Sequence, residues 1–256
     1  GVSREEFFEK LCPPLPDNHM PVKDEPGAVR QSDSRAFRHY VRENWTEEEW
    51  RMHRWAYARL TERVDGEIQT VLDALKASGH DRDTVVVFTS DHGDMDASHK
   101  MEHKSMPFEE AACVPMIVSC PGLVAEGVVD ETHLISTGLD LIPTLCDFAN
   151  IETPPELAGH SIKPLATSPD ANLQWRKTVV FENEFSRVLC TDRYKYAAYD
   201  RGEPRELLID RLNDPDEMTN LATDPANAPL LGRLRNQLKK WYAENGEKLP
   251  KRYIIE

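Results

Sequence analysis

The longest regular pattern of apolar positions predicts a helix over residues 46–78. Thr46 and Glu49 form the sequence signature of a capping box before it, and Gly79 is a typical C-terminal stop. The apolar positions recur at helical spacing, and they are Trp50, Tyr57, Leu60, Val64, Ile68, Val71, Leu72 and Leu75.

Two continuous apolar runs at 84–90 and 114–119 predict strands. Uninterrupted runs rich in β-branched residues are typical of strands buried on both faces of a parallel sheet. A further helix is predicted over 136–149. We therefore expect an α/β fold over residues 1–175, with a mainly parallel sheet flanked by helices. Residues 1–45 contain five prolines and are expected to be an irregular connecting segment.

From about residue 176 the pattern changes to short, closely spaced strands. They are predicted at 178–181, 187–191, 194–199 and 206–209, which favours a small antiparallel sheet. A helix over 226–244 is expected to pack against it. Residues 176–256 are therefore predicted to be a second, smaller domain.

The charge balance limits the class of partner. The chain has 31 Lys and Arg against 45 Asp and Glu, a formal net charge of −14. This charge argues against nucleic acid or an anionic membrane as the main partner. No apolar run approaches the roughly 20 residues that span a bilayer. A small anionic substrate remains compatible, since a local cation or lysine can reverse the sign inside a site.

Candidate chemistry lies directly after the strand predicted at 84–90. Asp91, His92 and Gly93 follow it, and the carboxyl ends of strands are where ligands bind in open α/β sheets. A carboxylate beside an imidazole can ligate a divalent cation, and Lys104, thirteen residues after Asp91, could neutralise an anionic oxygen. The same triplet also suits an ordinary polar turn. For His99, packing within the loop and contact with a substrate are both open.

Three ordered runs of residues resemble the formylglycine-dependent sulfatases of the alkaline-phosphatase superfamily. The first contains VVVFTSDHGDM at 85–95, then His99 and Lys104. The second combines STGLDLIPTL at 136–145 with LAGHSIKPL at 157–165. The third combines TDRYKY at 191–196, ELLID at 206–210 and DPDEMTNL at 214–221. The resemblance covers roughly residues 55–240.

This resemblance implies an alkaline-phosphatase-like fold and a hydrolase that removes sulfate from a small sulfated substrate, a carbohydrate in our expectation. It implies that Asp91 and His92 help to hold a divalent cation, usually Ca²⁺. Ligand type alone would favour Zn²⁺ or Mn²⁺ at His92. Lys104 matches the lysine that contacts the sulfate and its leaving oxygen, and His99 matches a histidine near the substrate pocket. The resemblance therefore implies a catalytic role for both residues. Arg187, at the start of a predicted strand, is a further candidate for substrate binding.

The nucleophile of this family is a Cys or Ser in C/S-x-P/A-x-R, and none of the five cysteines of the sequence completes this motif. Cys113 and Pro115 fit the motif, but Ile117 stands where arginine is required. The family's early pair of metal-binding carboxylates is also absent. We therefore expect residues 1–256 to be a C-terminal portion that is inactive alone, with formylglycine supplied by the N-terminal half of the same protein.

Two other functions remain open from the sequence. The first is hydrolysis of a phosphodiester, phosphonate or phosphomonoester, since relatives with those activities share the Asp-His pair. The second is a catalytically silent binding or structural module, which the missing nucleophile would also fit. The resemblance suggests a periplasmic or secreted location, which the sequence itself does not assign.

Overall fold

The chain forms two compact units. The computed structural model describes residues 1–32, 36–168 and 173–255. Unit 1 comprises residues 1–63, 92–113 and 180–256, and unit 2 comprises residues 64–91 and 114–179. The candidate loop after residue 91 therefore belongs largely to unit 1.

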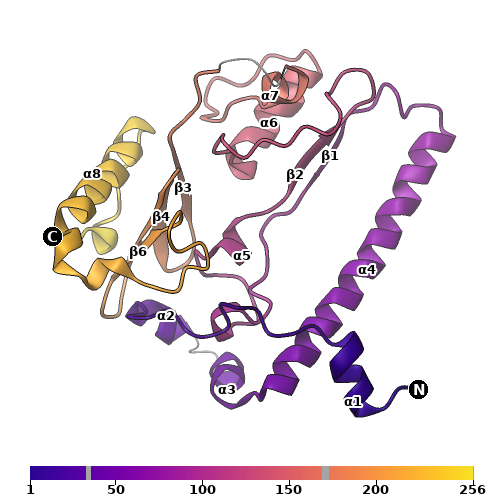
Figure 1. The fold of residues 1–256 in the computed structure, drawn as a ribbon. Helices are drawn as coiled ribbons and strands as arrows, with labels where there is room; N and C mark the ends of the chain where they lie inside the picture. Colours follow the sequence, from indigo (N-terminus) through magenta and orange to yellow (C-terminus); the bar gives the residue numbers. More distant parts are fainter. Residues whose placement is uncertain (33–35, 169–172, 256) are drawn as a thin grey trace. The chain divides into compact units, whose positions relative to one another are not determined.

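Helix α4 (Glu47–Ala77) confirms the predicted long helix, and its residues up to 63 belong to unit 1 (Figure 1). Its start shows the expected capping box. The Glu49 carboxylate accepts hydrogen bonds from the Thr46 N–H at 2.7 Å and the Thr46 hydroxyl at 2.8 Å. The Thr46 hydroxyl in turn accepts the Glu49 N–H at 3.3 Å. Two of the amides that an α-helix leaves unpaired at its start are satisfied in this way.

Unit 1 is organised around a four-stranded sheet in the order β3-β4-β5-β6. The strands are β3 (Thr178–Glu182), β4 (Ser186–Thr191), β5 (Tyr194–Tyr199) and β6 (Glu206–Asp210). Strand β5 pairs antiparallel with both β4 and β6, which confirms the small antiparallel sheet expected from the sequence.

Both faces of this sheet are covered. Helix α8 (Ala228–Glu244) lies along one face, where Leu231, Leu234 and Leu238 pack against Leu189 and Leu208 (Figure 1). The opposite face packs on a second apolar cluster drawn from the N-terminal segment and the loop after residue 92. That cluster includes Val29, Met95, Met101, Phe108, Val188, Ala197, Tyr199, Leu207 and Ile209. The candidate loop is therefore anchored in the core of unit 1.

The N-terminal segment was expected to be irregular, and this prediction was wrong. It contains α1 (Arg4–Glu6), a π-helical turn (Phe7–Leu11), α2 (Gly27–Ser32) and α3 (Ala36–Asn44), while residues 33–35 lie outside the described part. The prolines do not interrupt these helices. Pro26 directly precedes α2, and its carbonyl accepts the Val29 N–H at 3.0 Å.

Short elements complete unit 1. They are η2 (Ser98–Lys100), α5 (Glu109–Ala112), η3 (Leu221–Thr223), η4 (Pro225–Asn227) and η5 (Lys251–Tyr253). Among the described helices, none is both long and apolar enough to cross a lipid bilayer.

Unit 2 contains β1 (Val86–Thr89), β2 (Met116–Ser119), α6 (Thr137–Phe148) and α7 (Lys163–Thr167). The parallel arrangement predicted for the two strands was wrong, because β1 pairs antiparallel with β2. Thr89 at the end of β1 faces Met116 at the start of β2, so the chain between them leaves and returns at the same end. Burial on both faces is not found either, since Phe88 is 41% and Ile117 56% exposed.

A buried carboxylate gives a structural role to the second of the three runs of residues described above, 136–145 with 157–165. Asp140 is fully buried and accepts the backbone N–H groups of Ser136 and His160, each at 2.8 Å. The Arg176 guanidinium donates to both of its oxygens, at 2.5 and 2.7 Å. These bonds join the start of α6 to the segment before α7. This carboxylate therefore organises unit 2.

Candidate functional site

The loop after β1 is shaped by a close approach between two backbone segments. The Gly93 N–H donates to the carbonyl of Ala111 at 2.9 Å. A Cβ atom at Gly93 would lie 1.9 Å from the carbonyl oxygen of Glu110. Only glycine fits such an approach, so this residue fixes α5 against the first residues of the loop.

The structure brings His92 and Lys104 together. The His92 Nδ1 lies 2.8 Å from the carbonyl oxygen of Gly93, which makes Nδ1 the protonated nitrogen that donates to it. The Nε2 atom then carries a lone pair and accepts a hydrogen bond from the Lys104 ammonium group. Lys104 is exposed and His92 is half-buried. This pair offers one imidazole ligand and one positive charge side by side.

Asp91 directly precedes His92 and is exposed. The Ser90 hydroxyl lies 3.5 Å from one oxygen of its carboxylate. Asp91 is the last residue of its stretch in unit 2, whereas His92 begins the next stretch of unit 1. The predicted role of Asp91 as a metal ligand stays a prediction.

His99 lies in a different environment from the one expected of a substrate contact. It is fully buried, and its ring packs on Phe108 with centroids 4.2 Å apart. Burial lowers the pKa of its imidazole to about 4, so the ring is neutral at pH 7. Its ring lies near Glu110 and Glu217, and one potential ligand atom from each residue lies within 4.8 Å of the others. Its predicted catalytic role stays a prediction, and its burial favours an internal role.

A network of buried charges surrounds this cluster. Lys195 on β5 is fully buried, and its Nζ lies 2.5 Å from Glu109 Oε1 and 2.6 Å from Glu217 Oε1. The Arg211 guanidinium lies 3.2 Å from Glu109 Oε2. Burial alone would lower the pKa of Lys195, but the Glu217 and Glu109 carboxylates outweigh it and the pKa is raised. The lysine is therefore charged and joins β5 to α5 and to the turn after β6.

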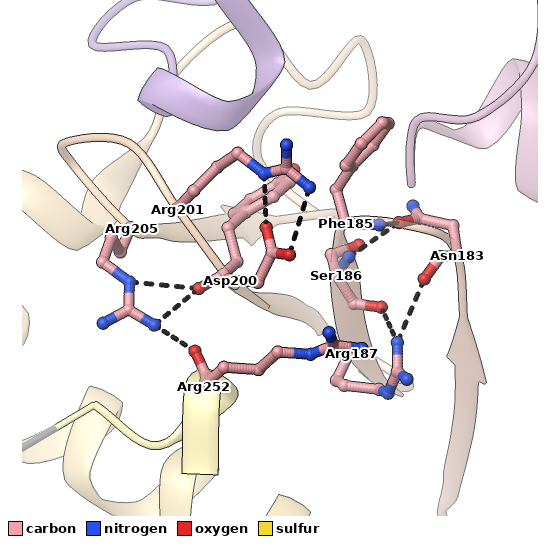
Figure 2. Close-up of polar contacts among 9 residues, drawn as sticks. Asn183, Phe185, Ser186, Arg187, Asp200, Arg201, Arg205 and Arg252 are labelled. Carbon is pink, nitrogen blue, oxygen red and sulfur yellow. Dashed lines mark hydrogen bonds and ion pairs between the residues drawn. The ribbon is translucent and has the colours of Figure 1, made fainter. Parts of the chain in front are cut away.

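The side chain of Arg187 is committed to contacts within unit 1 (Figure 2). Its guanidinium donates to the backbone carbonyls of Asn183 and Ser186, both at 3.0 Å. It also lies 3.0 Å from a Glu182 carboxylate oxygen and 4.3 Å from the ring centroid of Tyr253. These contacts fit a structural residue at the start of β4, and a role in substrate binding stays a prediction.

Sequence reasoning did not single out Lys195, Glu110 or Glu217 as a cluster. One indication was available: Lys195 interrupts the otherwise apolar or aromatic strand 194–199, where a charged residue facing a core must be paired. Its partners could not be found in this way. Glu109 and Glu217 are more than a hundred residues apart in the sequence and meet only through the tertiary fold.

Two protein-family models match the chain. The model described as "Sulfatase" matches residues 16–151. The model described as "N-sulphoglucosamine sulphohydrolase, C-terminal" matches residues 97–244. Each match covers more than half of the chain, and together they include the candidate loop and the C-terminal sheet.

Several characterised proteins are similar to the chain. A Delta 4,5-hexuronate-2-O-sulfatase of Bacteroides thetaiotaomicron is 34% identical over 92% of this chain and 51% of its own length. Arylsulfatase K of Rattus norvegicus is 32% identical over 70% of this chain and 34% of its own length. The chain thus spans about half the length of the first relative and about a third of the second.

Solved structures show the same similarity in three dimensions. A 2-O GAG sulfatase superimposes with a TM-score of 0.82 at 32% identity, covering 92% of this chain and 53% of that one. A phosphonate monoester hydrolase of Agrobacterium radiobacter gives a TM-score of 0.70 at 28% identity, covering 79% of this chain and 43% of that one. The fold is therefore that of sulfatases and their phosphonate-cleaving relatives.

Proposed function

This chain belongs to the sulfatase family, and we propose that it forms the C-terminal part of an enzyme that hydrolyses the sulfate ester of a carbohydrate. The similarity to a hexuronate-2-O-sulfatase and to a 2-O GAG sulfatase supports a 2-O-sulfated uronate sugar as the first substrate to test. A periplasmic or secreted location is part of the same proposal, and so is the division into domains at residues 1–175 and 176–256.

The observation that carries the proposal is the contact between His92 and Lys104 directly after β1. A sulfate ester that breaks leaves negative charge on its bridging oxygen, and a fixed ammonium group stabilises that charge in the transition state. Lys104 supplies this group from an exposed position. His92 keeps its proton at Nδ1, on the Gly93 carbonyl. The single lone pair of its Nε2 accepts from Lys104 in this structure, so Nε2 becomes a ligand for a cation once the Lys104 ammonium group turns to the sulfate.

The donor set after β1 fits part of a divalent-cation site. Asp91 offers an exposed carboxylate and His92 an imidazole nitrogen with a lone pair. A bound cation would stabilise negative charge on the sulfate oxygens. Ca²⁺ takes six to eight oxygen ligands, so these two side chains can only contribute to its site. Further carboxylates must come from elsewhere in the whole enzyme.

We propose that an N-terminal half of the same protein supplies those carboxylates and the formylglycine nucleophile. The chain spans only 51% of the length of its hexuronate-2-O-sulfatase relative. Unit 2 also exposes apolar side chains that a larger sheet would cover, such as Phe88 on β1, Ile117 on β2 and Val71 on α4, at 41%, 56% and 67%. Exposed apolar side chains on paired strands are the kind of surface that a neighbouring part of a larger protein would cover.

The test compares the full-length enzyme with residues 1–256 alone. The full-length enzyme should release sulfate from a 2-O-sulfated uronate disaccharide, and Lys104→Ala should lower that turnover. Lys248→Ala, a change of the same type at an exposed lysine near the C-terminus, serves as the matched control and should have no effect. The 256-residue chain should show no turnover. Equal turnover in the Lys104→Ala and Lys248→Ala enzymes would overturn the proposed role of Lys104.

Hydrolysis of a phosphonate monoester is the second candidate, and the similarity to the Agrobacterium radiobacter enzyme favours it. The same full-length enzyme is assayed on an aryl phosphonate monoester under identical conditions. Higher kcat/KM on the phosphonate than on any sulfate ester would replace the sulfatase proposal with this one. Failure to cleave either class would favour the non-catalytic binding module.

A further inference from the structure

We propose that His99, Glu110 and Glu217 form an internal site for a first-row divalent cation such as Zn²⁺ or Mn²⁺, separate from the Asp91 and His92 ligands. The three side chains come from η2, from α5 and from the turn after β6, all within unit 1. Among the described residues, they are the one group of three or more potential ligands whose donor atoms lie within 4.8 Å of one another.

His99 supplies the observation that separates this group from an ordinary acidic cluster. Its side chain is fully buried, and neither ring nitrogen has a hydrogen-bond partner of normal geometry. A buried imidazole without partners loses the hydrogen bonds it would make to water, at a cost in stability. The carbonyl of Met20 is an acceptor available to one ring N–H. This leaves the other nitrogen for a cation, as in many metal-bound histidines.

The charges of the cluster also favour a cation. Three carboxylates lie together, those of Glu109, Glu110 and Glu217, whereas Lys195 and Arg211 contribute two positive charges. Both basic side chains pair with Glu109, and Lys195 also pairs with Glu217. For Glu110, the described contacts are one hydrogen bond to Oε1 from the Asn18 amide at 2.5 Å and no hydrogen bond to its buried Oε2. One negative charge is therefore left without a counter-charge beside a neutral imidazole.

Glu217 can ligate a cation while it keeps its present hydrogen bond and ion pair. Its Oε2 accepts the Glu109 N–H at 2.7 Å, and its Oε1 lies 2.6 Å from the Lys195 ammonium. A carboxylate has about four lone-pair positions, so it can accept both and still ligate a cation. Ligating carboxylates are usually hydrogen-bonded to such outer groups.

The types of ligand atom at this site determine which divalent cation it should prefer. One imidazole with two carboxylates suits Zn²⁺ or Mn²⁺. Ca²⁺ requires six to eight oxygen ligands, so a three-residue site with a nitrogen donor disfavours it. The ion expected here therefore differs from the one that the sulfatase resemblance implies at Asp91 and His92.

The experiment measures Zn²⁺ binding by isothermal titration calorimetry on the 256-residue chain carrying Asp91→Ala and His92→Ala. This background removes the other candidate ligands, so the outcome is independent of sulfate ester hydrolysis. We expect one Zn²⁺ per chain. At a Zn²⁺ concentration of 100 times Kd, the thermal midpoint should rise by about 5–10 °C.

His99→Asn and Glu110→Gln in this background should each weaken Zn²⁺ binding by at least roughly 10–100-fold. Asparagine tolerates the left-handed backbone at His99, where φ is 53°. Glutamine can keep the hydrogen bond from Asn18. His103→Asn, the same change at another histidine of the loop, is the matched control and should bind Zn²⁺ like the background.

If the chain carrying only Asp91→Ala and His92→Ala did not bind Zn²⁺, the proposed metal site would be refuted. Equal affinity in the Glu110→Gln and His103→Asn chains would overturn it as well, since the ion would then lie elsewhere. Circular dichroism checks that each variant is folded. If His99→Asn fails to fold, Glu110→Gln alone decides, because it changes neither side-chain volume nor backbone.

Discussion

Replacing Lys195 with methionine tests whether the buried ion pairs stabilise unit 1. Methionine keeps most of the length of the side chain and removes its charge. Lys195 is fully buried, and its Nζ lies 2.5 Å from Glu109 and 2.6 Å from Glu217. Glu109 keeps the Arg211 guanidinium at 3.2 Å. The uncompensated charge in the variant therefore falls mainly on Glu217, whose side chain is 2% exposed.

Removing one partner of a buried ion pair costs about 3–5 kcal/mol, because the other charge is left desolvated. For a chain of this size, that loss corresponds to a fall in Tm of about 6–20 °C. The sign of the pH effect follows from the same reasoning. Burial already raises the pKa of Glu217 although Lys195 opposes the shift, and removing the lysine raises it further. The variant therefore recovers stability as the pH falls and loses it as the pH rises.

The assay is urea unfolding of the 256-residue chain at pH 7 and pH 5, followed by far-UV circular dichroism and tryptophan fluorescence. Lys240→Met is the matched control. Lys240 is 73% exposed, and its Nζ lies 3.3 Å from Glu244, one turn along α8. Such a surface pair contributes about 0.3–0.5 kcal/mol. If Lys195→Met lowered the free energy of unfolding no more than Lys240→Met at pH 7, the assigned role of the buried pairs would be refuted.

Three further predictions concern the loop and the sheet. In the full-length enzyme, Lys104→Ala should lower kcat by about 10²–10³-fold and leave metal content unchanged, as measured by kinetics with elemental analysis. Gly93→Ala should destabilise the chain by about 1–3 kcal/mol in thermal melts, because its Cβ would meet a backbone oxygen at 1.9 Å. Gly66→Ala, in open space on α4, should instead be neutral or stabilising. Arg193 holds the pKa of Asp210 at about 2, so this pair should stabilise the chain above pH 4 and lose its effect as the pH falls towards 2; acid unfolding of Arg193→Met should lack that contribution.

The elements that the sequence predicted well are those with strong local patterns. Helix α4 begins at its capping box and ends two residues before Gly79, and the strands after residue 176 form the expected antiparallel sheet. Strand direction was not accessible in the same way. A continuous apolar run indicates a strand, but the pairing of β1 with β2 depends on where the intervening residues 90–115 go.

Contacts within the candidate site were also not predictable from local sequence patterns. The structure brings His92 and Lys104 into contact, while their roles in metal binding and catalysis stay predictions. The grouping of His99 with Glu110 and Glu217 could not be predicted, because residue types that are common at surfaces become a buried cluster only through packing. Periodicity carries no information on contacts between segments a hundred residues apart.

The N-terminal segment, expected only to connect, is part of what shapes the loop. Between Asp96 and Ser105, five non-glycine residues have positive φ, a conformation that costs each of them about 1–3 kcal/mol unless other contacts enforce it. Those contacts come from earlier in the chain. The Asn18 carbonyl accepts the His99 N–H at 2.8 Å, and the His19 ring lies 2.6 Å from the Ala97 carbonyl. The Arg54 guanidinium lies 3.0 Å from Asp96. Since this strained loop joins His92 to Lys104, their separation depends on residues that no motif of the family singles out.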